Sequence, residues 1–168
     1  PRITAQSFLA ADLRNNYVFL EQSSRKVKPI SSLTKLVTAM TASEFVNFAR
    51  DITITKNVLV ETAKPRLRAG QKISVINLLF PLLMESSNEA VLAIANYLGQ
   101  GRLIELMINK AKAIGMTETT FTDVTGSHPG NQATAQDLFK LAKYIYTNRS
   151  FLLQISSGRF RSAAYDAP

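Results

Sequence analysis

Residues 29–40 read PISSLTKLVTAM, and Lys35 is the only charged side chain between Lys28 and Glu44. Apolar residues recur in this stretch at the spacing of one helix face, at Leu33, Leu36, Val37 and Met40. A helix is therefore expected from Ser31 onward. Because its other side chains are small or apolar, we expect this helix to be buried on most sides.

Ser32 and Lys35 lie three residues apart, so they share one face at the first turn of this helix. Burial desolvates a lysine ammonium, which lowers its pKa and allows the amine to accept a proton near neutral pH. A serine activated by such a base is one form of nucleophilic catalysis, and the positive end of the helix dipole favours the serine alkoxide. The pattern S-x-x-K is common by itself, and Lys35 could equally extend to solvent.

A second motif, Ser86-Ser87-Asn88, follows an apolar run at residues 78–84. One interpretation is structural, because Ser86 and Glu89 have the spacing of a capping box that begins a helix. The other is chemical, because S-x-x-K followed by S-x-N occurs in active-serine enzymes that react with penicillin.

The rest of the chain is expected to contain one β-hairpin followed mainly by helices. The hairpin spans residues 4–20 with its turn near Asn15-Asn16, since Asn tolerates a left-handed backbone. We expect a strand at residues 52–55, a turn at 70–74 and a loop at 121–133. Helices are expected at residues 75–84, 88–98 and 103–114, and from an N-cap at Thr134, paired with Asp137, through Tyr146. A lone hairpin is marginally stable and needs further strands or a helix to cover it.

Composition excludes several kinds of chemistry. The chain has no cysteine and a single histidine, His128, which excludes thiol chemistry and argues against a transition-metal site. A Ser-His-Asp triad of His128 with Asp123 or Asp137 is not favoured, because His128 lies in a Gly/Pro loop and is expected to be a surface residue.

The net charge of +8 suits an anionic partner. No nucleic-acid-binding signature is present, and the longest apolar run is too short to span a bilayer.

Together the two motifs give the chain a specific resemblance. Residues 29–40 resemble the nucleophile helix of the low-molecular-weight D-alanyl-D-alanine carboxypeptidases and endopeptidases, which are penicillin-binding proteins. Residues 82–90, LLMESSNEA, are similar to the second motif of that family. Further similar segments follow in collinear order, at residues 109–116, 120–121, 125–126 and 133–138.

The resemblance implies an α+β fold of the β-lactamase/transpeptidase type, with residues 1–168 as a single incomplete catalytic domain. It implies a sheet lobe at residues 1–28 and a mainly helical lobe at 29–168. The hairpin would belong to a five-stranded sheet whose C-terminal strands are absent from this sequence.

The resemblance also implies acyl transfer on the peptide stems of peptidoglycan. Ser32 would attack the carbonyl between two D-alanines, or a cross-link bond, with Lys35 as base. Ser86 and Asn88 would assist proton transfer and hold the substrate amide. The oxyanion would be held by the Ser32 N–H and by an N–H of an edge strand. β-Lactams would leave a slow acyl-enzyme on Ser32, and no metal or organic cofactor is implied.

One departure from the family pattern is the missing third motif, Lys-Thr-Gly or Lys-Ser-Gly. The lysines after Ser86 all have other neighbours, namely Lys110, Lys112, Lys140 and Lys143. We therefore expect a C-terminally incomplete fragment rather than a degenerate relative. A segment absent from the C-terminus could provide peripheral membrane association, and a location outside the cytoplasmic membrane, with a signal peptide removed, follows from the resemblance.

Two other functions stay open. A class A-like β-lactamase shares the first two motifs, but its E-x-x-L-N base segment is not matched, because Glu118 leads to Phe121-Thr122. A non-catalytic module that binds muropeptide or a partner protein would fit the loss of the third motif. Nucleic-acid binding rests on charge alone and is not expected.

Overall fold

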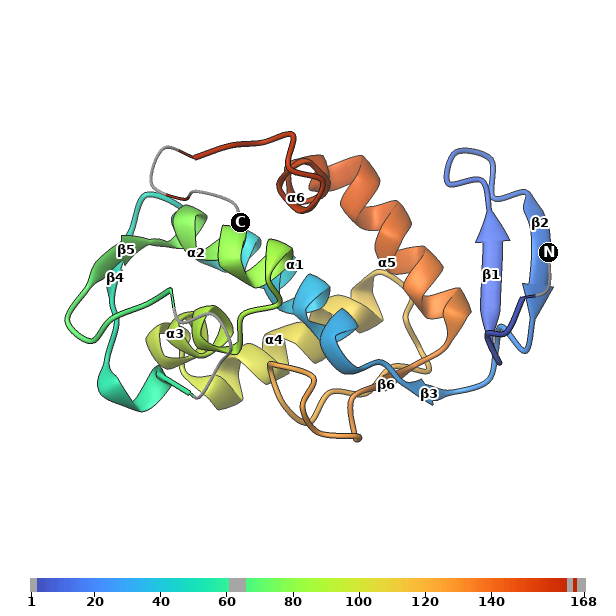
Figure 1. The fold of residues 1–168 in the computed structure, drawn as a ribbon. Helices are drawn as coiled ribbons and strands as arrows, with labels where there is room; N and C mark the ends of the chain where they lie inside the picture. Colours follow the sequence, from blue (N-terminus) through green and yellow to red (C-terminus); the bar gives the residue numbers. More distant parts are fainter. Residues whose placement is uncertain (1–2, 61–65, 163–164, 166–168) are drawn as a thin grey trace.

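The computed structural model describes residues 3–60, 66–162 and 165. Figure 1 shows a body of helices with a separate β-hairpin at one side. In the described part of the chain, the strands are β1 (Phe8–Ala11), β2 (Val18–Gln22), β3 (Lys28–Pro29), β4 (Asp51–Thr53), β5 (Lys72–Ser74) and β6 (Gln132–Ala133). The α-helices are α1 (Thr34–Phe45), α2 (Val75–Met84), α3 (Asn88–Leu98), α4 (Gln100–Ala113), α5 (Ala135–Asn148) and α6 (Ser150–Ser156).

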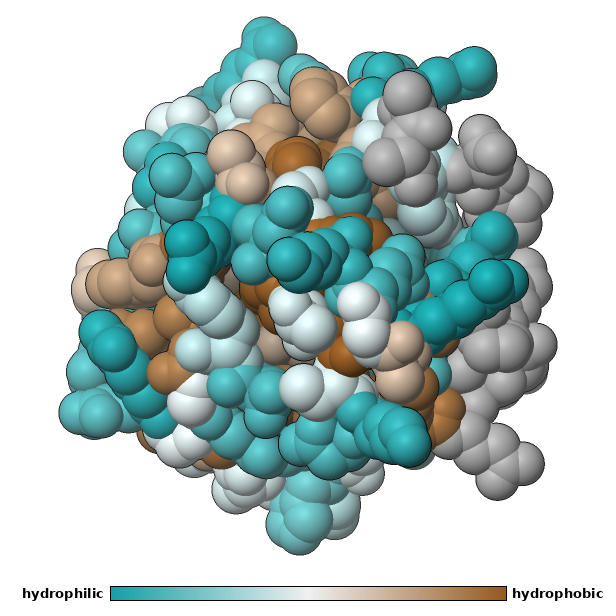
Figure 2. Space-filling model, turned by 90° about the vertical axis from the view of Figure 1, so that its left-hand side faces the viewer, coloured by the Kyte–Doolittle hydropathy of each residue, from teal (hydrophilic) through white to brown (hydrophobic). Residues whose placement is uncertain are grey.

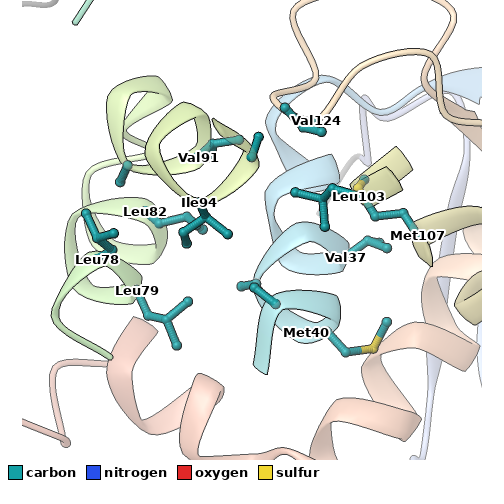
Figure 3. Packing of buried hydrophobic residues seen from close by; sticks show 14 of the residues in the cluster. Val37, Met40, Leu78, Leu79, Leu82, Val91, Ile94, Leu103, Met107 and Val124 are labelled. Atoms are coloured by element: carbon teal, nitrogen blue, oxygen red, sulfur yellow. The ribbon is translucent and has the colours of Figure 1, made fainter. Parts of the chain in front are cut away.

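Helix α1 forms the centre of the hydrophobic core, as its nearly uncharged sequence predicts. Its buried residues face every direction around the axis: Thr34, Lys35, Val37, Thr38, Ala39, Met40, Thr41 and Ala42. Leu82 of α2 and Ile94 of α3 pack on one side of α1, and Leu103 and Met107 of α4 pack on the opposite side (Figure 3). Because α1 is enclosed in this way, a polar side chain on it must find its partners inside the protein.

The start of this helix differs slightly from the expectation. Residues Ser31–Leu33 form a single 3₁₀ turn, and the α-helix proper begins at Thr34. A 3₁₀ turn is a common way to begin an α-helix. Ser32 therefore lies one turn before α1, on the same continuous helical segment.

The predicted hairpin is confirmed, since β1 and β2 pair antiparallel with an irregularity between Ala10 and Ala11. Asn16 in its turn has a positive φ of 63°. Helix α5 packs against β1, whereas every residue of β2 is exposed. In the described part of the chain, β1 and β2 form a two-stranded sheet, and their membership of a five-stranded sheet stays a prediction.

Several local predictions were wrong or incomplete. Residues 72–74 of the predicted turn form strand β5, which pairs with β4. The predicted loop at 121–133 ends in β6, which pairs with β3 over only two residues. The strand expected at 52–55 ends at Thr53, and helix α6 was not predicted at all. Pairings this short depend on the fold around them and leave little periodic signal in the sequence.

The helices at 75–84 and 88–98 are confirmed at their predicted bounds, with Pro81 inside α2. The Thr134 hydroxyl accepts from the backbone N–H of Asp137, as predicted for the start of α5.

No helix among the described residues is long and apolar enough to cross a membrane. Figure 2 views the end of the molecule away from the hairpin, where hydrophobic residues show only in patches between hydrophilic ones. The division into lobes at residue 29 stays a prediction.

Candidate active site

Ser32 and Lys35 meet at the beginning of α1. Ser32 is exposed, whereas Lys35 is only 5% exposed and lies under it. Lys35 Nζ donates to Ser32 Oγ at 3.2 Å and to the backbone carbonyl of Thr125 at 2.9 Å. The lysine therefore does not extend to solvent, and its amine lies against the hydroxyl of an accessible serine.

The surroundings of Lys35 favour its neutral form. Burial is the larger influence and lowers the pKa of the Lys35 amine below its ordinary value, while the negative charge of Asp123 partly raises it again. A lysine with a lowered pKa is neutral for a larger fraction of the time at a given pH and can then accept a proton. The pair can thus act as a nucleophile with an adjacent base.

A groove of about 430 Å³ opens over this pair. Its lining includes Ser32, Lys35 and Ser86, so it brings residues of both sequence motifs to one surface. The remaining lining residues are mostly apolar: Ile30, Ser31, Leu33, Leu36, Leu82 and Leu83. A larger cavity of about 460 Å³ beside Phe80 and Tyr165 contains none of these motif residues.

Ser86 reaches the groove through an unusual backbone conformation. After α2 ends, the N–H groups of Glu85 and Ser87 both donate to the carbonyl of Pro81, at 3.1 and 3.0 Å. The residue between them, Ser86, has a φ of +56°, a region where glycine is usual at helix ends. A serine in this conformation costs about 1–2 kcal/mol of backbone strain. Strained backbone of this kind is common at functional sites.

The capping interpretation of Ser86 is wrong, because the neighbouring serine caps α3. The hydroxyl of Ser87 accepts from the N–H of Ala90 at 3.2 Å. Asn88, the first residue of α3, is not among the residues that line the groove. Its buried Oδ1 has no hydrogen-bond partner among the described residues. The structure thus brings Ser86 to Ser32 and Lys35, and it leaves the role predicted for Asn88 untested.

The loop between α4 and β6 completes the site, and sequence reasoning missed its contribution. It carries the Thr125 carbonyl that accepts from Lys35. It also carries Asn131, fully buried, whose Nδ2 donates to Thr34 Oγ1 at 3.0 Å. Thr38, one turn further along α1, donates to the carbonyl of Val124 at 2.7 Å. The loop is therefore fastened to the face of α1 that carries Lys35.

Gly126 allows this loop to approach so closely. A Cβ at this position would lie 1.9 Å from the carbonyl oxygen of Ser31, and its φ is +84°. Ser31 itself has a positive φ of 44°, so the backbone is unusual on both sides of the contact. The Thr125-Gly126 pair in the sequence was the signal that could have revealed this contact.

His128 does not form a catalytic triad. Its ring Nδ1 lies 3.1 Å from Thr122 Oγ1 and accepts from the N–H of Gly130 at 3.0 Å. Asp123 accepts from the backbone N–H of His128 rather than from its ring. Among the described residues, no group of three or more His, Cys, Asp and Glu could hold a metal ion.

The comparison with known families agrees with this geometry. Residues 1–161 match the D-alanyl-D-alanine carboxypeptidase family. The chain belongs to this family. It is 30% identical, over 175 residues, to a D-alanyl-D-alanine endopeptidase of Escherichia coli (strain K12), an alignment covering 100% of this chain and 56% of that protein. It is 34% identical to the D-alanyl-D-alanine endopeptidase of Haemophilus influenzae, over 91% of this chain and 54% of that protein.

Solved structures of the family share the fold. The D-alanyl-D-alanine carboxypeptidase DacD from Francisella tularensis superposes with a TM-score of 0.84 at 31% identity, over 93% of this chain and 40% of that one. Penicillin binding protein 6B from Escherichia coli gives a TM-score of 0.85 at 25% identity, over 98% and 57%. The predicted α+β fold of the β-lactamase/transpeptidase type is confirmed. The chain spans about half the length of the curated relatives it matches.

Proposed function

We propose that the protein is a serine-type D-Ala-D-Ala carboxypeptidase or endopeptidase that cleaves peptidoglycan stem peptides through an acyl-enzyme on Ser32. The observation that supports this most strongly is the buried Lys35 amine, held between Ser32 Oγ and the Thr125 carbonyl under an open groove. Membership of the D-alanyl-D-alanine carboxypeptidase family gives the reaction class.

In the acylation step, neutral Lys35 takes the proton of Ser32 while Ser32 Oγ bonds to the carbonyl carbon of the scissile amide. The resulting oxyanion is stabilised by the Ser32 N–H at the start of the helical segment. When the C–N bond breaks, the leaving amine takes up a proton, and Ser86 relays it from Lys35. A water molecule then hydrolyses the ester, which regenerates the Ser32 hydroxyl.

Asn88 is proposed to hold the substrate amide, as the family pattern implies. Its Oδ1 is a buried acceptor without a described partner, so it has hydrogen-bonding capacity to offer. Because Asn88 does not line the groove as it stands, this role requires its side chain to turn toward the bound substrate. β-Lactams are proposed as inhibitors that acylate Ser32 in place of the substrate.

Peptidoglycan lies outside the cytoplasmic membrane, so we propose an extracytoplasmic location, periplasmic or at the cell surface, after export and removal of a signal peptide. Peripheral membrane association through a further C-terminal segment belongs to the same proposal. No cofactor and no nucleic-acid partner are part of it.

Intact-protein mass spectrometry of the full-length protein with benzylpenicillin tests the function. We expect a covalent adduct that is absent from Ser32→Ala and slowed by at least about 100-fold in Lys35→Met, because the general base is lost. The absence of an adduct on the folded wild type would refute the acyl-enzyme and favour a non-catalytic binding module. An adduct that disappears within seconds would indicate a β-lactamase-like hydrolase instead.

Substrate choice is tested separately. Release of D-alanine from a pentapeptide stem would identify a carboxypeptidase, whereas cleavage of a cross-linked dimer would identify an endopeptidase. Loss of both activities in Ser32→Ala would assign them to the same nucleophile.

A further inference from the structure

We propose that Asp123 is a positioning residue for Lys35. The Asp123 carboxylate fixes the loop of residues 123–128 so that the Thr125 carbonyl accepts a hydrogen bond from the lysine amine. The inference rests on the proposed function, because it concerns the same nucleophile and base. It adds a residue outside both sequence motifs.

Four donors converge on the Asp123 carboxylate. Oδ1 accepts from the N–H of Thr125 at 2.6 Å, from the Thr125 hydroxyl at 2.7 Å and from the N–H of Gly126 at 2.7 Å. Oδ2 accepts from the N–H of His128 at 2.8 Å. Burial favours the neutral acid, but these hydrogen bonds outweigh it and lower the pKa of Asp123, so the group is a carboxylate. Hydrogen bonds to a carboxylate are stronger than those to a neutral acceptor, so this loop has one strongly preferred conformation.

That conformation is fastened to α1 at two points. Asn131 Nδ2 donates both to the backbone carbonyl of Asp123, at 2.9 Å, and to Thr34 Oγ1, at 3.0 Å. The Thr125 carbonyl accepts from Lys35, one residue further along the helix. These hydrogen bonds, together with the chain itself, form a closed ring that joins Thr34, Asn131, Asp123, Thr125 and Lys35. The carboxylate of Asp123 joins the N–H groups of Thr125, Gly126 and His128 within this ring.

The charge of Asp123 acts on Lys35 as well. Burial lowers the pKa of Lys35, and the Asp123 carboxylate opposes that effect. The elements packed against α1 and the loop over it carry other titratable or charged side chains: Glu44 on α1, Glu85 after α2, Glu89 and Tyr97 on α3, Arg102, Glu105, Lys110 and Lys112 on α4, and His128 on the loop. The Asp123 charge is the one that counters the desolvation of Lys35.

Both contributions of Asp123 act in one direction. The carbonyl that it positions and the charge that it carries each stabilise the protonated amine. A base must be neutral to take the Ser32 proton, yet basic enough to hold it until the amine leaves. Asp123 therefore keeps Lys35 from becoming too weak a base in its buried position.

The test is the pH dependence of acylation by benzylpenicillin in full-length Asp123→Asn. The acid limb, where Lys35 loses its proton as pH rises, should move to lower pH by about one unit, because the protonated amine loses a charge partner. The maximal acylation rate should fall by about tenfold, because the amine is less well positioned. An acid limb that coincides with that of the wild type would overturn the proposal.

Asp137→Asn is the matched control. Asp137 is also buried and also organises a loop, since it accepts from the N–H of Glu118 at 2.9 Å and from the Thr119 hydroxyl at 2.9 Å. The Asp137→Asn variant should be less stable than the wild type, but its acylation should show the same acid limb as the wild type. If Asp137→Asn moves the limb equally, the effect is general loosening and the proposal fails.

If Asp123→Asn does not fold, Asp123→Ser takes its place. A serine hydroxyl can still accept from the N–H groups two residues on, but it carries no charge. The same acid shift is expected, and its absence would count against the proposal. A wild type that never acylates would refute the proposed function instead, so the two failures are distinguishable.

Discussion

The start of α1 and the β1–β2 hairpin differ sharply in how much of their surface the other described residues bury. Around Lys35, a helix and a loop 90 residues away exchange hydrogen bonds that leave the lysine only 5% exposed. In the hairpin, β2 is exposed along its whole length, and the aromatic residues Tyr17 and Phe19 are 63% and 66% exposed. Those rings contact each other edge-on, with centroids 5.1 Å apart.

This difference shows where the geometry of the candidate site comes from. The nucleophile, the base and the groove depend on helix packing and on one fastened loop, all within residues 30–131. The hairpin contacts the helices through β1 and α5 and contributes no residue to the groove. Changes at the start of α1 should therefore affect stability and acylation strongly, and changes on the outer strand of the hairpin should affect both weakly.

The largest effect is expected for Gly126→Ala. The new methyl group would overlap the Ser31 carbonyl, and its backbone would be strained at a φ of +84°. We expect a loss of more than about 4 kcal/mol in the free energy of unfolding, together with loss of acylation. Chemical denaturation monitored by circular dichroism measures the first, and mass spectrometry with benzylpenicillin measures the second.

Gly158→Ala is the control, because Gly158 also has a positive φ, of +69°, but has open space around its Cβ position. Only the conformational cost of about 1 kcal/mol is expected there. Equal losses in the two variants would show that the contact with Ser31 is unimportant.

The next effect compares the core with the hairpin directly. Ile94→Ala, at a fully buried position against α1, should cost about 2–5 kcal/mol of unfolding free energy. Phe19→Ala, on the exposed strand, should stay within about 0.5 kcal/mol. Urea midpoints of both variants decide the matter. If Phe19→Ala lowers the free energy of unfolding as much as Ile94→Ala does, the outer face of β2 is covered in solution. The hairpin would then not differ from the core in its contribution to stability.

The same contrast explains which features could be predicted from the sequence. Ser32, Lys35 and the burial of α1 follow from spacing along one helix and from the absence of charge, which are local properties. The Thr125 carbonyl and the Asp123 carboxylate could not be found this way, because backbone carbonyls have no sequence signal and the loop is 90 residues distant. Ser86 and Ser87 could not be told apart either, since the positive φ of Ser86 arises from the turn after α2. The two-residue pairing of β3 with β6 is equally a product of the fold.

A smaller effect of opposite sign is expected for Lys35→Met. A buried lysine contributes little stability or opposes folding, so the variant should be about 1 kcal/mol more stable at neutral pH while losing acylation. The pKa of Lys35 is lowered in the folded state, so between that value and the ordinary value of 10.5 the unfolded chain binds more protons. Wild-type stability therefore rises with pH across this window, and the advantage of Lys35→Met should shrink there. Denaturation midpoints measured across the window check this, and an advantage that grows with pH would contradict it.

The smallest effect concerns the two adjacent serines. Ser86→Gly should raise the free energy of unfolding by about 0.5 kcal/mol, because glycine adopts a φ of +56° without strain. Its acylation rate should nevertheless fall, since the hydroxyl in the groove is lost. Ser87→Ala should behave in the opposite way, losing about 1 kcal/mol with its cap to Ala90 and acylating at nearly the wild-type rate. A more stable but slower Ser86→Gly would mean that the strain at Ser86 persists because its side chain is needed at the groove. A Ser86→Gly variant that is less stable than the wild type would instead mean that the serine supports the turn after α2, and its position at the groove would then have a structural cause.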